Sequence, residues 1–151
     1  MIAEAGPEEI DSVMEVMEQA FDPLFGEAWN RAQCLGILGL PGVWMSLARV
    51  DGEPCGFALG RIVLDDAELL LIAVKPLARG KGIGKRLLDH MIRAAAARGA
   101  ARLHLEVRDG NPALRLYGEK GFEPIGRRKS YYTGQFGQTY DALTLTRPIT
   151  G

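Results

Sequence analysis

Cysteine and histidine are scarce in this chain of 151 residues, which holds two of each. Cys34 and Cys55 do not form a C-x-x-C pair, so we expect two reduced thiols. His90 and His104 lie apart without neighbours of the kind that bind metals, so we predict no metal site. The composition therefore excludes a disulfide-stapled miniprotein.

The chain also lacks a long hydrophobic run and a surplus of one charge. Its longest apolar stretch, residues 35–48, is interrupted by glycine and proline and is too short to cross a membrane. The first residues, Met1 to Glu4, lack the basic start of a signal peptide. The net charge of −1 argues against a general nucleic-acid binder. We therefore expect a cytoplasmic protein with neither a membrane nor a nucleic acid as partner.

What is present is typical of a globular domain. Hydrophobic residues make up 47% of the chain and charged residues 25%, which is enough apolar material for a core. No repeat, linker or low-complexity run divides the sequence. We therefore expect residues 1–151 to form a single domain.

The charges are separated along the chain. Residues 1–34 carry eight acidic side chains and one basic, whereas residues 75–102 carry eight basic side chains and one acidic. The basic block surrounds a glycine-rich turn and predicts an anionic ligand there, and the acidic segment would attract a cationic partner. The alternative is a solvated basic helix face. The basic block lacks interleaved aromatic residues, which argues against a single-stranded nucleic acid as the anion.

The hydrophobic periodicity predicts an α/β arrangement with a mixed sheet. The predicted strands cover residues 2–5, 43–50, 54–63, 68–74, 102–107, 122–125 and 140–145. The predicted helices cover residues 7–21, 27–38, 83–98 and 112–121. Asp51 and Gly52 are typical of a hairpin turn. Strand 68–74 is almost wholly apolar, as expected of a strand buried on both faces.

The chemistry of the chain centres on the segment Arg79-Gly80-Lys81-Gly82-Ile83-Gly84-Lys85, which follows strand 68–74 and opens a helix. Its three glycines let the backbone bend tightly and approach a ligand closely. The unpaired N–H groups at the helix start lie at the positive end of the helix dipole. This combination predicts a phosphate-binding turn.

Two well-known phosphate loops do not fit this segment. A P-loop needs four residues between its first glycine and the Gly-Lys pair, followed by Ser or Thr, whereas three residues separate Gly80 from Gly84 and Arg86 follows Lys85. A dinucleotide fingerprint needs G-x-G-x-x-G, and the second spacing here is too short.

The remaining pattern, R-x-x-G-x-G after an apolar strand, resembles the pyrophosphate loop of the GNAT acyltransferases. The strand Ala67-Glu68-Leu69-Leu70-Leu71-Ile72-Ala73-Val74 and the later N…A…LY…GF pattern over residues 111–122 extend the resemblance. The segments LEVRDGN, RRKSYY and YDALTL are similar to the RimI type, the ribosomal-protein alanine N-acetyltransferases. This resemblance implies a mixed, mostly antiparallel sheet of six to seven strands with about four helices, and acetyl-CoA as cosubstrate.

The resemblance also implies which residues hold the cofactor. Backbone groups of residues 72–74 would run beside the pantetheine arm, and the N–H of Val74 would polarise the thioester carbonyl. Asn111 would contact the same arm, with a plain helix N-cap as the alternative. Arg79 would brace the pyrophosphate loop. The full set is Ile72, Ala73, Val74, Arg79, Gly80, Lys81, Gly82, Ile83, Gly84, Lys85 and Asn111.

By the same resemblance, an amine attacks the acetyl thioester directly. Glu106 is the expected base, with Glu68 as second candidate, and Tyr117 is the expected acid that protonates the leaving thiolate. The alternatives are surface or ion-paired carboxylates and a core aromatic ring. The spacing from Asn111 to Tyr117 is one residue shorter than the RimI type implies, and we expect a bend at Pro112 to restore the position of Tyr117.

The acceptor is the least determined part of the prediction. The resemblance implies a protein N-terminus, with a basic peptide favoured by the acidic N-terminal segment. Tyr131 and Tyr132, together with residues 127–129, are expected to flank the acceptor cleft or else to form a solvated strand end. Trp29 and Trp44 are expected in the core. A small-amine acetyltransferase and a non-catalytic acyl-CoA-binding module stay open as alternatives, and no oligomeric state is predicted.

Overall fold

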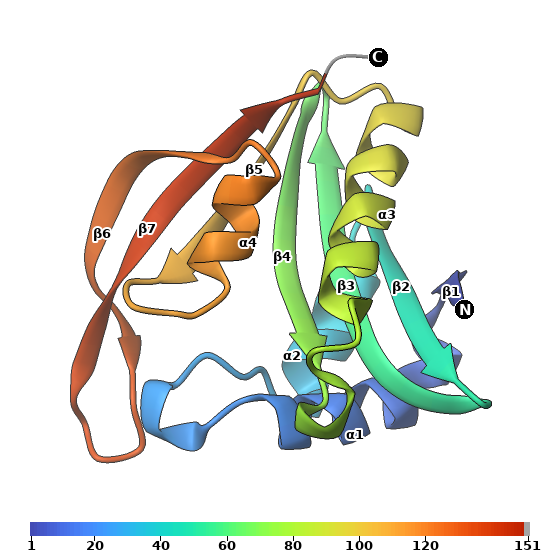
Figure 1. Cartoon of the computed structure of the whole chain (residues 1–151), viewed down its shortest axis with the longest axis horizontal. Helices are drawn as coiled ribbons and strands as arrows, with labels where there is room; N and C mark the ends of the chain where they lie inside the picture. The colour runs from blue at the N-terminus through green and yellow to red at the C-terminus, as the bar shows by residue number, and fades with distance from the viewer. Residues whose placement is uncertain (150–151) are drawn as a thin grey trace.

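The computed structural model describes residues 1–149, which form one seven-stranded sheet in the order β1-β2-β3-β4-β5-β7-β6 (Figure 1). The strands are β1 (Ile2–Ala5), β2 (Val43–Val50), β3 (Glu53–Val63), β4 (Asp66–Val74), β5 (Arg102–Arg108), β6 (Glu123–Thr133) and β7 (Thr139–Pro148). The α-helices are α1 (Ile10–Ala20), α2 (Arg31–Leu38), α3 (Ile83–Ala97) and α4 (Leu114–Glu119). Short 3-10 turns are η1 (Pro7–Glu9), η2 (Pro23–Phe25) and η3 (Pro76–Ala78). The predicted α/β architecture and its mostly antiparallel sheet are confirmed.

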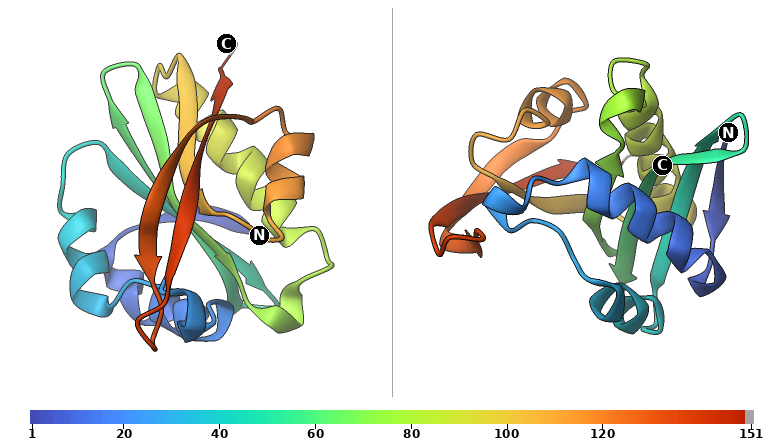
Figure 2. Two further views of the ribbon diagram at one scale, coloured as in Figure 1. Left: turned by 90° about the vertical axis from the view of Figure 1, so that its left-hand side faces the viewer. Right: turned by 90° about the horizontal axis from the view of Figure 1, so that it is seen from below.

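Helices cover both faces of the sheet (Figures 1 and 2). The buried residues of α1 pack on one face of the central strands, against Met45, Leu47 and Phe57. Those of α3 pack on the other face, together with Tyr117 of α4. Successive strand residues therefore alternate between the two cores, because side chains along a strand point to opposite faces.

One pair of neighbouring strands differs from the rest. β4 and β5 run parallel, whereas the other neighbours in the sheet are antiparallel. Their pairing covers Asp66 to Leu69 opposite Arg102 to Leu105 and then stops. Figure 1 shows the two strands separating toward their carboxyl ends. The sheet is thus open at this end, between two strands that both continue for several residues.

Several predicted boundaries are wrong, for local reasons. α2 begins at Arg31 rather than at Glu27, because Asn30 and Gln33 form a reciprocal capping box there. The last helix begins at Leu114, two residues after Pro112. β6 continues to Thr133 instead of ending near Ile125, so the predicted cleft residues 127–132 lie within a strand.

The predicted hairpin turn at Asp51 and Gly52 and the two unpaired thiols are confirmed. Asp51 and Gly52 both have positive φ, 53° and 79°, as a two-residue hairpin turn requires. Cys34 and Cys55 are buried free thiols. No group of His, Cys, Asp and Glu within residues 1–149 is placed to hold a metal ion. No helix in that part of the chain is long and apolar enough to cross a membrane.

Candidate active site

The glycine-rich segment forms the connection between β4 and α3. Gly80 and Gly82 have φ of 80° and 76°, a left-handed conformation that residues with a Cβ adopt at a cost. A Cβ on either glycine would meet no atom within 4 Å, so the space beside the turn is open. The turn lines a cavity of about 350 Å³. Its lining residues are Val74, Arg79, Gly80, Gly82, Ile83, Gly84 and Lys85.

Arg79 holds this turn to its surroundings. Its Nε donates a hydrogen bond to the carbonyl oxygen of Val74 at 3.2 Å. Its Nη2 donates to the carbonyl oxygen of Ala20, the last residue of α1, at 2.6 Å. The guanidinium therefore joins the ends of β4 and α1 while its charge stays next to the cavity.

Most charges of the acidic N-terminal segment are neutralised within the molecule. Five of its eight carboxylates lie in ion pairs with basic residues that are 20 to 94 positions away along the chain. The pairs are Glu4–Arg98, Glu9–Arg49, Asp11–Arg31, Glu15–Lys75 and Glu27–Arg108. The acidic segment consequently offers a basic acceptor less free charge than the sequence predicts.

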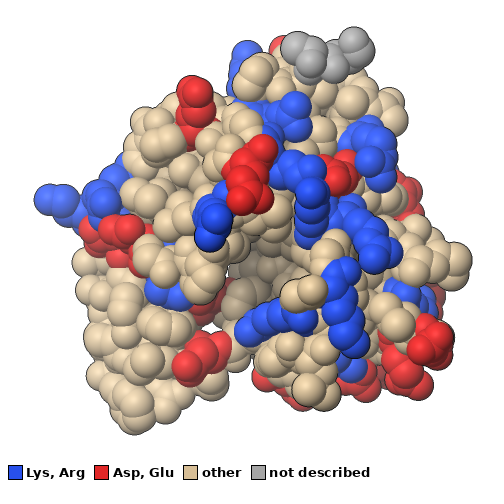
Figure 3. All heavy atoms as spheres, in the orientation of Figure 1, with Lys and Arg blue, Asp and Glu red and all other residues tan. Residues whose placement is uncertain are grey.

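Several basic side chains without an acidic partner among the described residues lie at the glycine-rich turn. Within residues 1–149, Lys81 and Lys85 have no acidic partner, and Arg86 donates only to the carbonyl oxygen of Lys81 at 3.4 Å. Figure 3 shows Lys and Arg side chains beside a hollow in this face. An open turn with unpaired backbone N–H groups and free lysines fits a phosphorylated ligand.

A second cavity, of about 130 Å³, lies where β4 and β5 separate. Carboxylates and aromatic rings from several elements line it. Its lining residues are Phe21, Glu27, Trp29, Glu68, Leu69, Leu70, Leu71, Ile72, Leu105, Glu106, Val107, Asn111, Tyr117, Tyr131 and Tyr132. It therefore gathers the predicted catalytic residues Glu106 and Tyr117, the second candidate base Glu68, and Asn111 and Ile72 of the predicted cofactor set. Ala73 is buried and belongs to neither cavity lining.

Strand β4 has an irregular register beside this cavity, which the sequence did not indicate. Leu71 pairs with Leu59 and Leu69 pairs with Gly60, so Leu70 is an extra residue in β4. Such a bulge redirects backbone and side-chain groups. Because β4 no longer pairs with β5 beyond Leu69, backbone groups of β4 on that side face the cavity.

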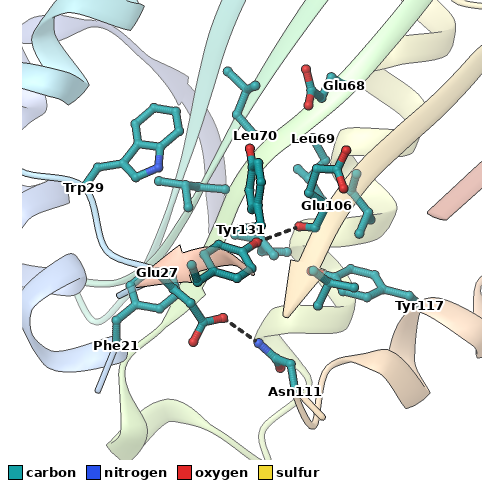
Figure 4. A pocket seen from close by; sticks show the side chains of 15 residues that line it. Phe21, Glu27, Trp29, Glu68, Leu69, Leu70, Glu106, Asn111, Tyr117 and Tyr131 are labelled. Atoms are coloured by element: carbon teal, nitrogen blue, oxygen red, sulfur yellow. Dashed lines mark hydrogen bonds between the residues drawn. The ribbon is translucent and has the colours of Figure 1, made fainter. Parts of the chain in front are cut away.

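The Glu106 carboxylate is held by two partners. The hydroxyl of Thr144 donates to Oε2 at 2.7 Å, and Arg128 Nε lies 3.0 Å from Oε1. The side chain is 12% exposed. Glu68 lies near it (Figure 4) but is 36% exposed and pairs only loosely with His104 at 3.9 Å. Of the two carboxylates, Glu106 is the better fixed.

Tyr117 is buried and points into the same cavity from α4. Its ring packs against Phe122 with centroids 5.8 Å apart. Burial and, to a lesser degree, the negative charge of Glu27 raise the pKa of the Tyr117 hydroxyl well above its usual range. The phenol therefore stays protonated at neutral pH. Although the spacing from Asn111 to Tyr117 is one residue shorter than in the RimI type, Tyr117 still lines the cavity.

The late tyrosines Tyr131 and Tyr132, which the sequence predicts beside the acceptor cleft, line this cavity. The Tyr132 hydroxyl donates to the backbone oxygen of Glu106 at 3.5 Å. Burial, followed by the charge of Glu27, raises the pKa of Tyr132 well above its usual range. Tyr131 packs edge-on against Tyr132 and is half exposed.

Sequence reasoning described two residues of the lining incompletely. Trp44 is buried as expected, whereas Trp29 packs against the core but is only partly buried and also lines the cavity. Glu27 was expected on a helix, yet it lies in the loop before α2 and reaches Asn111 (Figure 4). The Asn30–Gln33 capping signature was the one indication that Glu27 precedes the helix.

Residues 10–122 match the acetyltransferase (GNAT) family. The chain belongs to the GNAT acetyltransferase family. Its relatives confirm the expected resemblance to the RimI type, so the protein is an N-acetyltransferase. Members of this family take the acetyl group from acetyl-CoA.

Two relatives and two solved structures show how far the similarity extends. Ribosomal protein bS18-alanine N-acetyltransferase of Escherichia coli strain K12 is 40% identical over 100 residues, 66% of this chain and 67% of the relative. The protein of that name from Haemophilus ducreyi is 32% identical over 138 residues, 86% of this chain and 94% of the relative. The structure of the Escherichia coli ribosomal-protein-S18-alanine N-acetyltransferase has a TM-score of 0.88 at 29% identity, covering 100% of this chain and 94% of that one. Ard1 from Thermoplasma volcanium has a TM-score of 0.83 at 25% identity, covering 100% of this chain and 98% of that one.

Proposed function

We propose that this GNAT enzyme transfers acetyl from acetyl-CoA to the α-amino group of a protein whose first residue is alanine. The observation that carries the proposal is the opening between β4 and β5. It brings the Glu106 carboxylate and the Tyr117 phenol to one cavity, next to the basic turn. The relatives named as ribosomal protein alanine N-acetyltransferases support the acceptor class.

The basic turn is the proposed site of the pyrophosphate. Backbone N–H groups of residues 80–85 and the side chains of Lys81 and Lys85 would bind its oxygens, with Arg79 bracing the turn. The backbone of Ile72, Ala73 and Val74, on the edge that no longer pairs with β5, would run beside the pantetheine arm. The second N–H of the Asn111 amide is left for the same arm, because the first donates to Glu27.

Glu106 and Tyr117 have opposite proposed roles in proton transfer. A free α-amino group has a pKa near 8, so Glu106 need only take a proton from it as the new C–N bond forms. When the C–S bond breaks, the electron pair stays on sulfur, and the phenol of Tyr117 supplies the proton that restores the thiol. The proton taken from the amine leaves through Glu106 to water, and Tyr117 regains a proton from solvent.

The acceptor side of the cavity favours a small first residue. Trp29, Tyr131 and Tyr132 line the cavity, and the volume of the whole cavity is about 130 Å³. A methyl side chain takes up little of this space, whereas a large side chain would compete for it with the acetyl group. A ribosomal type of acceptor, together with the two free thiols, supports a cytoplasmic location.

Mass spectrometry after incubation with acetyl-CoA tests this function. The acceptors are a basic peptide with a free N-terminal Ala, the same peptide N-blocked but carrying Lys, and a panel of small amines. We expect acetyl on the free-Ala peptide alone. Acetylation of the small amines alone would replace the proposed acceptor class. If acetyl-CoA binds and nothing reacts, the acceptor lies outside the three classes tested and the proposed acceptor class is wrong.

A further inference from the structure

Residues 21–29, which include η2 and lead into α2, form a loop that is one wall of the proposed acceptor side, and Glu27 belongs to this loop. Gly26 turns the chain just before it with a φ of 69°. A Cβ on Gly26 would lie 1.9 Å from the carbonyl oxygen of Thr133, so this loop is pressed against the end of β6. The Glu27 side chain is only 11% exposed and points into the cavity (Figure 4).

Glu27 joins this loop to two other elements. Its Oε1 accepts from Arg108 Nε, at the end of β5, at 3.2 Å. Its Oε2 accepts from Asn111 Nδ2, before α4, at 3.0 Å. The Arg108 guanidinium is itself 10% exposed and lies 3.7 Å over the ring of Phe25. A buried carboxylate with two such donors costs far more to disturb than a surface ion pair.

The loop is fixed on its opposite side by the β6–β7 hairpin. The N–H of Gln135 donates to the carbonyl oxygen of Pro23 at 3.3 Å, and Gln138 Nε2 donates to that of Leu24 at 3.2 Å. The rings of Phe25 and Tyr140 meet edge-on at 5.2 Å. In Figure 1 this loop meets the hairpin below β6 and β7. With the hairpin on one side, Glu27 supplies the attachment on the other.

We infer that Glu27 is a positioning residue, which holds residues 21–29 against β5 and α4 as the wall of the acceptor cleft. This inference rests on the proposed function for its acceptor. Phe21 and Trp29 flank the held loop and line the cavity, so their placement depends on where the loop docks. The glycine-rich turn lines a separate cavity to which Glu27 contributes nothing. Glu27 therefore governs acceptor binding more than acetyl-CoA binding, to which it is linked only through the Asn111 amide.

The competing role for Glu27 is that of a second base. A base would take a proton from the amine, so its loss would lower kcat and leave the acceptor KM unchanged. A positioning residue shows the opposite division. The Glu27 carboxylate is paired with a guanidinium that is itself buried, Arg108 at 10% exposure, whereas Arg128, the partner of Glu106, is 61% exposed, and this difference favours positioning for Glu27.

The test compares Glu27→Gln with the wild type in steady-state kinetics on whichever acceptor the wild type acetylates. We expect the acceptor KM to rise about tenfold or more, the size of a lost hydrogen bond to a charged group. We expect kcat to fall by less than about threefold and the acetyl-CoA Kd to stay within about twofold. Glu18→Gln is the matched control, because it removes an exposed carboxylate from the same acidic segment. A large fall in kcat at constant KM would make Glu27 a base, and unchanged kinetics would remove it from the site.

Two further measurements keep the inference separate from folding and from the choice of acceptor. If Glu27→Gln unfolds because Arg108 is left buried and unpaired, the double variant Glu27→Gln with Arg108→Gln removes both charges, and its KM should stay raised. Hydrogen exchange does not depend on turnover. Amides of residues 24–29 should exchange faster in Glu27→Gln, while those of residues 80–86 should not change. Unaltered exchange in that loop would overturn the inference even if the proposed acceptor were wrong.

Discussion

Replacing Tyr117 by Phe removes one hydroxyl and nothing else from the cavity. The ring is 5% exposed and would keep its edge-on contact with Phe122. Burial and the charge of Glu27 raise the pKa of the Tyr117 hydroxyl, which makes no hydrogen bond to another described residue. Since the variant leaves no polar partner unsatisfied, we expect the free energy of unfolding to change by less than about 0.5 kcal/mol.

The expected effect on turnover follows from the leaving group. General acid catalysis contributes about 10² to 10⁴ in rate. A thiol has a pKa of about 8.5, so a thiolate leaves without full protonation and the lower end of that range applies. We therefore expect kcat to fall about 100-fold, which corresponds to about 2.7 kcal/mol of transition-state stabilisation.

The assay follows thiol release under saturating acceptor, with acetyl-CoA affinity measured separately by calorimetry. The acetyl-CoA Kd should stay within about twofold of the wild type. Tyr140→Phe is the matched control, because it removes the same hydroxyl group from a residue outside the cavity lining and keeps the ring that packs against Phe25. A Tyr117→Phe enzyme with wild-type kcat would refute the assignment of the acid.

Three further outcomes test other parts of the molecule. Glu106→Gln should lower kcat about 100-fold in the same turnover assay, whereas the kcat of Glu68→Gln should stay within about threefold of the wild type. The reverse order would make Glu68 the base. The double variant Lys81→Ala with Lys85→Ala should raise the acetyl-CoA KM about tenfold, and this difference from the wild type should shrink at about 1 M salt. A difference that does not depend on salt would contradict the electrostatic argument. Burial, and then the charge of Arg93, lower the pKa of His90, so the unfolded chain binds the extra proton first as the pH falls below about 6.5. Denaturant unfolding should therefore show stability falling by up to about 1.4 kcal/mol per pH unit below that value, and His90→Asn should flatten this dependence.

The order of strands and helices could be predicted from the sequence because the patterns that indicate them are local. The apolar strand, the glycine turn and the amphipathic α3 follow one another within residues 66–97, and each has a distinctive pattern. The Asp51-Gly52 turn likewise determines its own hairpin. Such features need no knowledge of distant contacts.

What sequence reasoning missed depends on contacts between distant residues. Glu27 belongs to the site through Arg108 and Asn111, partners 81 and 84 positions away. The bulge at Leu70 arises from pairing with β3, and no residue type marks it. The neutralisation of the acidic segment is also nonlocal, since its partners lie up to 94 positions away, as Arg98 does from Glu4. Periodicity and motifs contain none of this information.

The short pairing between β4 and β5 separates the part of the molecule proposed to bind acetyl-CoA from the part proposed to bind the acceptor. Only four backbone pairs join the strands that carry the glycine turn to the strands that carry Glu106, Tyr131 and Tyr132. The chain crosses from one group to the other at Gly99, an exposed glycine with a φ of 87°. A chimaera joined at Gly99 would exchange the strands of the proposed acceptor cleft while disturbing those four pairs, the core packing across them and the bonds of Glu27 to Arg108 and Asn111. With those bonds retained, this architecture would let the acceptor range change with little alteration of the glycine turn proposed for acetyl-CoA.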